Sequence, residues 1–281
     1  MHMALPRACL NAKLFRMRWL FGIPCIALCL SASSTQRRDA GKFGGTFIGV
    51  IVAEDGIVVG SDSRSTFLDG SGKPVGYVDR IPKIYVSHGA ALAVAGLTSV
   101  DDELFGGFIR RNEHLLDSSP NEILYDVALK LPLRNTTNVV MISAGYVHGE
   151  ATICAKVPVE PQSCRKTGYF ANKDSPGLRR WFQSRGGRGT TLREAAPALE
   201  RAIREAADLD TAIGGPISLL GMSPDGSDQW IQNPPNDNGW TRVCDIVTSY
   251  RSGTTPIFFT DSKQELDRYL GGVCPQNSAR P

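Results

Sequence analysis

The sequence predicts an α+β fold in which two antiparallel sheets pack together between outer layers of helices, a four-layer αββα sandwich. Apolar runs rich in β-branched residues recur in pairs around short turns. Pairs of helix-period segments separate them, so the order is strands, two helices, strands, two helices, strands. Strands that are apolar on both faces need a covering layer on each side. With 281 residues, 42% of them hydrophobic, the chain can bury such a core.

The first strands follow one another closely. Residues 46–53 and 56–63 are apolar on both faces and are joined by the turn sequence AEDG, which predicts a buried hairpin. Glycine and proline in residues 67–82 indicate a loop. Two further short strands are expected at 83–87 and 90–97.

Two helices are expected next. Residues 98–116 have an interrupted apolar face, and the acidic group that ends at Glu103 is predicted to form the first turn. Residues 118–131 open with Ser-Ser-Pro, a helix start, and continue with an apolar period.

The second half repeats this order. Strands are predicted at 138–147 and 150–157, helices at 175–184 and 191–210, and a strand with its turn at 214–226 followed by a strand at 228–232. Pro197 is expected to confine the regular part of its helix to the residues that follow it. Residues 233–281 are weakly patterned.

The N-terminal segment has the parts of an export signal. A basic stretch ends at Arg18, residues 19–30 are apolar, and small residues follow, which predicts cleavage near Ala32 or Ser33. The apolar run is shorter than the about 20 residues that span a bilayer. We therefore expect a periplasmic or secreted protein without a stable membrane span. The alternatives are a start at Met17 and an uncleaved anchor, which would leave the protein cytoplasmic or membrane-anchored.

Charge argues against a nucleic-acid partner. The formal net charge is +3, but residues 1–45 hold seven basic residues and one acid, which leaves 24 basic and 27 acidic residues from Thr46 onward. The body of the chain is mildly acidic and lacks the basic footprint that nucleic acid requires.

Four cysteines lie outside the N-terminal segment: Cys154, Cys164, Cys244 and Cys274. Their spacings do not match a zinc site, so we expect no metal and no cofactor. Two disulfides in an oxidising compartment fit better, although three connectivities are possible and buried free thiols are the alternative.

The stretch TFIGVIVAEDGIVVGSDSRST, which begins at Thr46, resembles the start of a mature proteasome β subunit. The resemblance continues through PKIYV and AVAGL to DLDTAIGGPISLLGMSPDG and covers about residues 45–232. It implies an N-terminal nucleophile (Ntn) hydrolase fold. On this basis residues 1–45 are signal peptide plus propeptide, 46–232 the hydrolase domain, and 233–281 an extension without counterpart.

A threonine at this place has a chemical reason. The threonine hydroxyl is a weak nucleophile, but the α-amino group of an N-terminal threonine, with a reference pKa of about 7.7 to 8.0, can accept its proton. That amine exists only after the preceding peptide bond is cut. The resemblance therefore implies that Gly45-Thr46 is an autocatalytic processing junction, where glycine lets the backbone bend towards the hydroxyl.

The resemblance also implies roles for other residues. Asp62 and Lys83 match the family's acid and lysine, and the ammonium group would lower the pKa of the hydroxyl and amine. Gly96 matches the glycine whose N–H forms the oxyanion hole, and Asp210 matches the acid that supports the N-terminus. The supporting matches are Arg64, Gly214 and Gly215.

Two positions depart from the family pattern. Ile213 stands where the family has a serine before the Gly-Gly pair. The other supporting serine has no clear match; the expected region is residues 166–172, with Thr167 as the nearest hydroxyl.

Each assignment has a structural alternative. Thr46 could open a strand as a β-former, and Asp62 with Lys83 could be a simple ion pair. Gly96 could serve a turn and Asp210 a solvated loop.

Three functions follow. The first is a proteasome-type threonine peptidase acting on peptides, and the second an Ntn amidase acting on small acylated amides. The third is a non-catalytic, proteasome-like scaffold subunit, to which the loss of the serine at position 213 would point. A homo-oligomer is expected for a proteasome-like peptidase.

Overall fold

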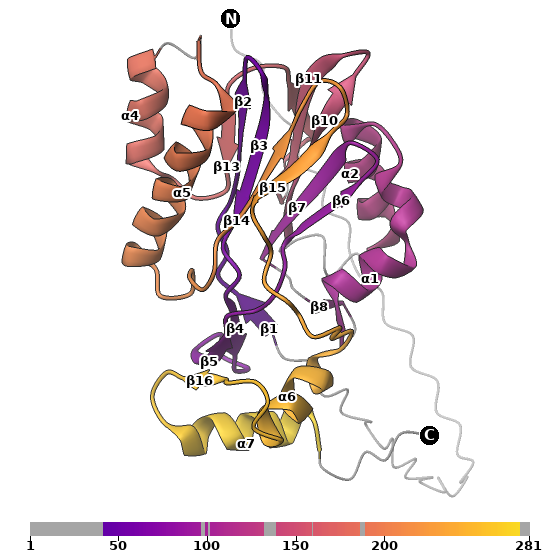
Figure 1. Ribbon diagram of the computed structural model, residues 1–281. Coiled ribbons are helices and arrows are strands. Elements are labelled where there is room, and N and C mark those ends of the chain that lie inside the picture. The colour runs from indigo at the N-terminus through magenta and orange to yellow at the C-terminus, as the bar shows by residue number, and fades with distance from the viewer. Residues whose placement is uncertain are drawn as a thin grey trace, which may run out of the picture. The chain divides into compact units, whose positions relative to one another are not determined.

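The computed structural model describes residues 42–96, 99–100, 102–131, 139–158, 160–185 and 189–275 (Figure 1). All described residues belong to one compact unit. The predicted signal peptide and its cleavage site lie outside the described residues. None of the helices in the described part is long and apolar enough to cross a membrane.

Two five-stranded antiparallel sheets form the centre of this unit. The first has the order β13-β2-β3-β14-β15, with bounds Tyr169–Ala171, Ile48–Ala53, Gly56–Ser61, Ser218–Met222 and Asp228–Gln232. The second has the order β12-β11-β10-β7-β6, with bounds Ser163–Arg165, Glu150–Lys156, Val139–Val147, Ala90–Gly96 and Ile84–Ser87. β12 and β13 are short strands that the sequence pattern did not reveal.

The predicted β2–β3 hairpin shows why both of its faces are apolar. It pairs from Ile48 opposite Ser61 to Ala53 opposite Gly56. Alternate residues such as Ile48 and Val50 face the second sheet, whereas Ile51 faces the helices on the other side. The hairpin is therefore covered by two different layers.

Helices cover the outer face of each sheet. α4 (Pro176–Arg185) and α5 (Leu192–Leu209) pack on the first, and α1 (Phe105–Arg111), η1 (Glu113–Leu116) and α2 (Pro120–Lys130) on the second (Figure 1). The predicted four-layer αββα sandwich is confirmed.

Two helix predictions were wrong in detail. α5 runs through Pro197 without interruption, and its buried face extends on both sides of the proline. The first helix begins only at Phe105, because Asp102 adopts a left-handed turn (φ +73°) between two short strands, β8 (Ser99–Val100) and β9 (Glu103–Leu104).

The predicted loop at 67–82 was also wrong. It contains most of a hairpin of β4 (Ser65–Leu68) and β5 (Pro74–Val78), which belongs to a third sheet of order β1-β4-β5-β16. The edge strands are β1 (Lys42–Gly44) and β16 (Phe258–Phe259). Apolar residues of β4 and β5 pack against α6 (Val243–Arg251) and α7 (Lys263–Val273), so residues 233–275 complete this sheet (Figure 1).

Two disulfides are present, as expected from the four cysteines. Cys154–Cys164 joins the paired strands β11 and β12, and Cys244–Cys274 joins α6 to the end of α7.

We expect the second disulfide to contribute more to stability than the first. The double variant Cys244→Ser/Cys274→Ser should lose about 3 kcal/mol of unfolding free energy. The reason is that the 30-residue loop closed by this disulfide restrains the denatured chain more than the shorter loop does. The 10-residue loop of Cys154–Cys164 restrains less, so its double serine variant is the comparison in urea denaturation. Equal losses would contradict this prediction.

Candidate active site

The predicted processing junction lies between β1 and β2. Gly45 has φ +79°, and a Cβ atom there would overlap the side chain and carbonyl group of Ala212. Only glycine fits this backbone conformation and this close approach. Thr46 follows with 2% of its surface exposed. The junction is thus a tight, buried bend.

The carboxylate of Asp62 lies directly after β3 and is fully buried. It accepts three backbone hydrogen bonds, from Phe47 N (2.9 Å), Arg64 N (3.1 Å) and Gly214 N (3.0 Å). Donors from three segments therefore fix both oxygens of the carboxylate.

Lys83, just before β6, brings its ammonium group into the same space. Its Nζ donates to Thr46 Oγ1 (2.8 Å), Asp62 Oδ1 (2.9 Å) and the Arg64 carbonyl (2.5 Å). These partners match the three donors of an ammonium group. Burial lowers the pKa of Lys83, while the neighbouring Asp62 carboxylate opposes that shift by favouring the charged form.

The hydroxyl of Thr46 lies next to the bond that processing would break. Thr46 Oγ1 donates to the Gly45 carbonyl oxygen (2.5 Å), and Lys83 Nζ is 3.5 Å from the same oxygen. A nucleophile, a group able to exchange a proton with it, and the carbonyl of the preceding residue therefore meet at one point.

The Gly214-Gly215 pair packs against the segment that follows Asp62. The Gly214 carbonyl accepts hydrogen bonds from Ser63 N (3.1 Å) and Arg64 N (2.9 Å). A Cβ at Gly214 would lie 2.7 Å from Arg64 Cζ, and one at Gly215 would lie 2.7 Å from Ser63 Oγ. The pair lets two chain segments touch through their backbones.

Arg64 is anchored by its side chain. Nε and Nη2 form a two-pronged ion pair with Asp79 (2.7 and 2.8 Å), and Nη1 donates to the Thr211 carbonyl (2.9 Å). Its guanidinium carbon lies 3.8 Å from the ring centre of Tyr77. Asp79 and Tyr77 belong to the segment for which a loop was predicted, so the sequence pattern did not identify them.

Two predicted site residues, Gly96 and Asp210, make their hydrogen bonds elsewhere than at Thr46 in the part of the chain that the structure describes. Gly96 ends β7 with φ +95°, near the Lys83 end of that sheet, since Val94 N donates to the Lys83 carbonyl. Asp210 caps α5, binds Ala212 N (3.0 Å) and pairs with Lys173 (3.3 Å). Within the described ranges no hydrogen bond joins either residue to Thr46.

The two positions that depart from the family pattern are also placed. Ile213 is buried in the core between the first sheet and α5. Thr167 is exposed and lies just before β13, whose pairing begins at Ile51, away from Thr46.

A further polar side chain, that of Asn172, bonds the main chain of Thr46 and was not predicted from the sequence. Its Nδ2 donates to the Thr46 carbonyl (2.9 Å), and its Oδ1 accepts from Ile48 N (2.8 Å). The available signal was a polar residue at the end of the apolar run YFA, inside the segment 166–172.

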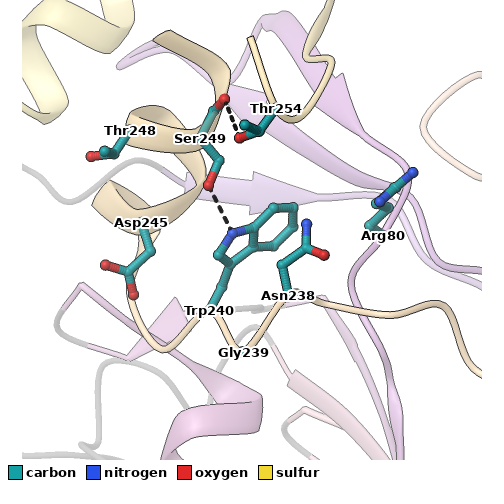
Figure 2. A pocket seen from close by; sticks show the side chains of 8 residues that line it. All are labelled: Arg80, Asn238, Gly239, Trp240, Asp245, Thr248, Ser249 and Thr254. Atoms are coloured by element: carbon teal, nitrogen blue, oxygen red, sulfur yellow. Dashed lines mark hydrogen bonds between the residues drawn. The ribbon is translucent and has the colours of Figure 1, made fainter. Parts of the chain in front are cut away.

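A separate cavity of about 630 Å³ lies beside α6, between Arg80 and the residues around Trp240 (Figure 2). Side-chain hydrogen bonds join residues of its lining: Trp240 Nε1 donates to Ser249 Oγ (3.1 Å), and Thr254 Oγ1 donates to the Ser249 carbonyl (2.9 Å). It lacks the convergence of groups found at Thr46. In the described part of the chain, no group of three or more His, Cys, Asp or Glu side chains is placed to hold a metal ion.

Comparison with known proteins identifies the fold. No protein-family model and no curated protein matches the sequence. The structure is similar to that of a Gly-1 mutant of Anbu from Hyphomicrobium sp. strain MC1, with a TM-score of 0.52 and 16% sequence identity. The match covers 74% of this chain and 99% of the Anbu chain. Anbu is a bacterial proteasome-like protein of the Ntn type, so the fold is proteasome-related.

Proposed function

We propose that this protein is a threonine-type Ntn hydrolase that processes itself at Gly45-Thr46 and then cleaves amide or peptide bonds. The observation that carries the proposal is the buried set Thr46 Oγ1, Lys83 Nζ and Asp62 Oδ1, with contacts of 2.8 and 2.9 Å, at a glycine bend. A structural ion pair alone does not require a threonine hydroxyl as third partner.

Self-processing follows from this arrangement in two steps. Thr46 Oγ1 adds to the Gly45 carbonyl carbon; as the C–N bond breaks, the Lys83 ammonium gives a proton to the departing amide nitrogen and takes up the hydroxyl proton in its place. The product is an ester between Gly45 and the threonine oxygen, with a free α-amine on Thr46. Water then hydrolyses the ester and releases the propeptide acid.

The same groups would act on a substrate. With the α-amine as base, Thr46 Oγ1 attacks the substrate carbonyl, the amine portion leaves with a proton, and water hydrolyses the acyl ester. β1 pairs with β4, Gly44 lying opposite Thr66, and departure of residues 42–44 would free that edge of β4. An extended peptide is the substrate class that could pair with it.

The mass and N-terminal sequence of the purified full-length chain test the proposal. Wild type is expected to begin at Thr46, whereas Thr46→Ala should retain Gly45. Thr190→Ala, which removes a buried hydroxyl in a different part of the fold, should process like wild type. If wild type and Thr46→Ala both retain Gly45, the enzymatic proposal fails and a non-catalytic scaffold is the better account.

An amidase acting on small acylated amides is the second candidate. The two disulfides favour it, because they fit an exported protein, and an exported protein would work outside the compartment of a cytosolic protease assembly. The molecular mass in solution separates the candidates. A ring of subunits would favour the peptidase, and a monomer or dimer the amidase.

A further inference from the structure

A stack of three planar groups connects the C-terminal extension to Arg64. The Phe258 ring in β16 lies 5.1 Å from the Tyr77 ring in β5, with 23° between their planes. The Arg64 guanidinium carbon lies 3.8 Å from the Tyr77 ring centre. Arg64 comes from the β4 side of Tyr77 and Phe258 from the β16 side, so the tyrosine ring lies between them.

At its Arg64 end, the stack reaches the main-chain groups that bond Asp62 and Lys83, the proposed catalytic pair. Arg64 N donates to Asp62 Oδ2 (3.1 Å), and the Arg64 carbonyl accepts from Lys83 Nζ (2.5 Å). One residue therefore bonds both members of the pair through its main chain. Its position depends on what its side chain touches, namely Asp79, the Thr211 carbonyl and Tyr77.

Phe258 is itself held in place. It pairs directly opposite Tyr77, and a Cβ on Gly76 would lie 2.7 Å from the Phe258 carbonyl, so the two strands are in close contact. Behind this sheet, Leu266 and Leu270 of α7 are fully buried, and Cys244–Cys274 ties α7 to α6. Strand pairing, the buried face of α7 and the disulfide therefore hold the Phe258 ring in position.

We infer that Phe258 is a positioning residue of the active site: it presses Tyr77 against Arg64 and so sets the two main-chain groups that orient Asp62 and Lys83. The inference rests on the proposed function for its catalytic consequence. It makes the extension, which lies outside the proteasome-like part of the sequence, a component of the site.

Amide hydrogen exchange in the full-length protein tests the positioning directly and does not require activity. In Phe258→Ala the Arg64 amide should exchange about tenfold faster, because local opening becomes easier. Phe259→Ala is the matched control: Phe259 is also half exposed, but it lies opposite Gly76 on the other face of the strand. Phe259→Ala should leave the exchange rate of the Arg64 amide unchanged. Phe258→Tyr keeps an aromatic ring, so its Arg64 amide should exchange at the wild-type rate.

The rate of processing at Gly45-Thr46 gives the catalytic readout. Phe258→Ala should slow it by about tenfold, and in an Arg64→Lys background the same change should have no further effect, since both act through one contact. Unchanged exchange at Arg64, or additive losses of rate, would overturn the inference. Faster exchange in a protein whose wild type never processes would instead contradict the proposed function while leaving the positioning intact.

Discussion

Lys83→Met is expected to slow cleavage of the Gly45-Thr46 bond by about a thousandfold, the contribution typical of a positioned proton-transfer group. Methionine fills similar space but can neither donate a hydrogen bond to Thr46 Oγ1 nor relay a proton to the leaving nitrogen. The time course of precursor cleavage, followed by intact mass, measures the effect. A rate within tenfold of wild type would show that the lysine is not part of the chemistry.

The same substitution should also destabilise the protein. Without the ammonium group the fully buried Asp62 carboxylate loses its cation, and removing one partner of a buried ion pair costs about 3–5 kcal/mol. Urea denaturation measures the loss. Lys73→Met is the control, because Lys73 is a half-exposed lysine paired with Asp261 and Glu265 at the surface. Surface pairs contribute little, so this control should change neither stability nor cleavage.

Gly45→Ala is expected to slow processing by at least about a hundredfold, because displacing the scissile carbonyl by about 1 Å from the nucleophile has an effect of that size. The added methyl group would overlap Ala212, and the residue would keep a positive φ that alanine disfavours. The carbonyl must therefore move away from Thr46 Oγ1. Intact mass of the full-length variant would show uncleaved precursor.

The stability of the same variant separates overlap from backbone strain. In a Thr46→Ala background, which keeps the junction intact, Gly45→Ala should cost about 2 to 4 kcal/mol. Gly72→Ala is the control: Gly72 has φ +87° but open space around it, so only the conformational cost of about 1 kcal/mol remains. Equal losses of unfolding free energy for the two glycines would mean that Ala212 moves aside for the added methyl group. That result would contradict close packing at the junction.

Sequence reasoning worked best where the signal is local. The β2–β3 hairpin was readable because its apolar residues and turn lie within fourteen residues, and α2 because its cap and its period are contiguous. Thr46, Asp62 and Lys83 were proposed from residue types at family-like spacing, and the structure brings their side chains into contact.

Other features had no local signal. Residues 67–82 contain Gly and Pro and were predicted to form a loop, yet Phe67, Val75 and Val78 become buried once α6 and α7 cover them. The pattern of a half-buried strand can be recognised only when its covering layer is known. The tail was weakly patterned for the same reason, since its two short helices depend on this sheet for a core.

The sequence by itself determined the layers, the principal strands and helices, the four cysteines outside the N-terminal segment, and a threonine preceded by glycine. Periodicity and residue chemistry act over a few neighbouring positions, and these features need nothing more. Only the tertiary structure decided that Asn172 bonds Thr46, that Tyr77 and Asp79 contact the Arg64 side chain, and that Phe258 stacks on Tyr77. These partners come from segments up to about two hundred residues apart, and they meet only because the sheets and the C-terminal helices pack as they do.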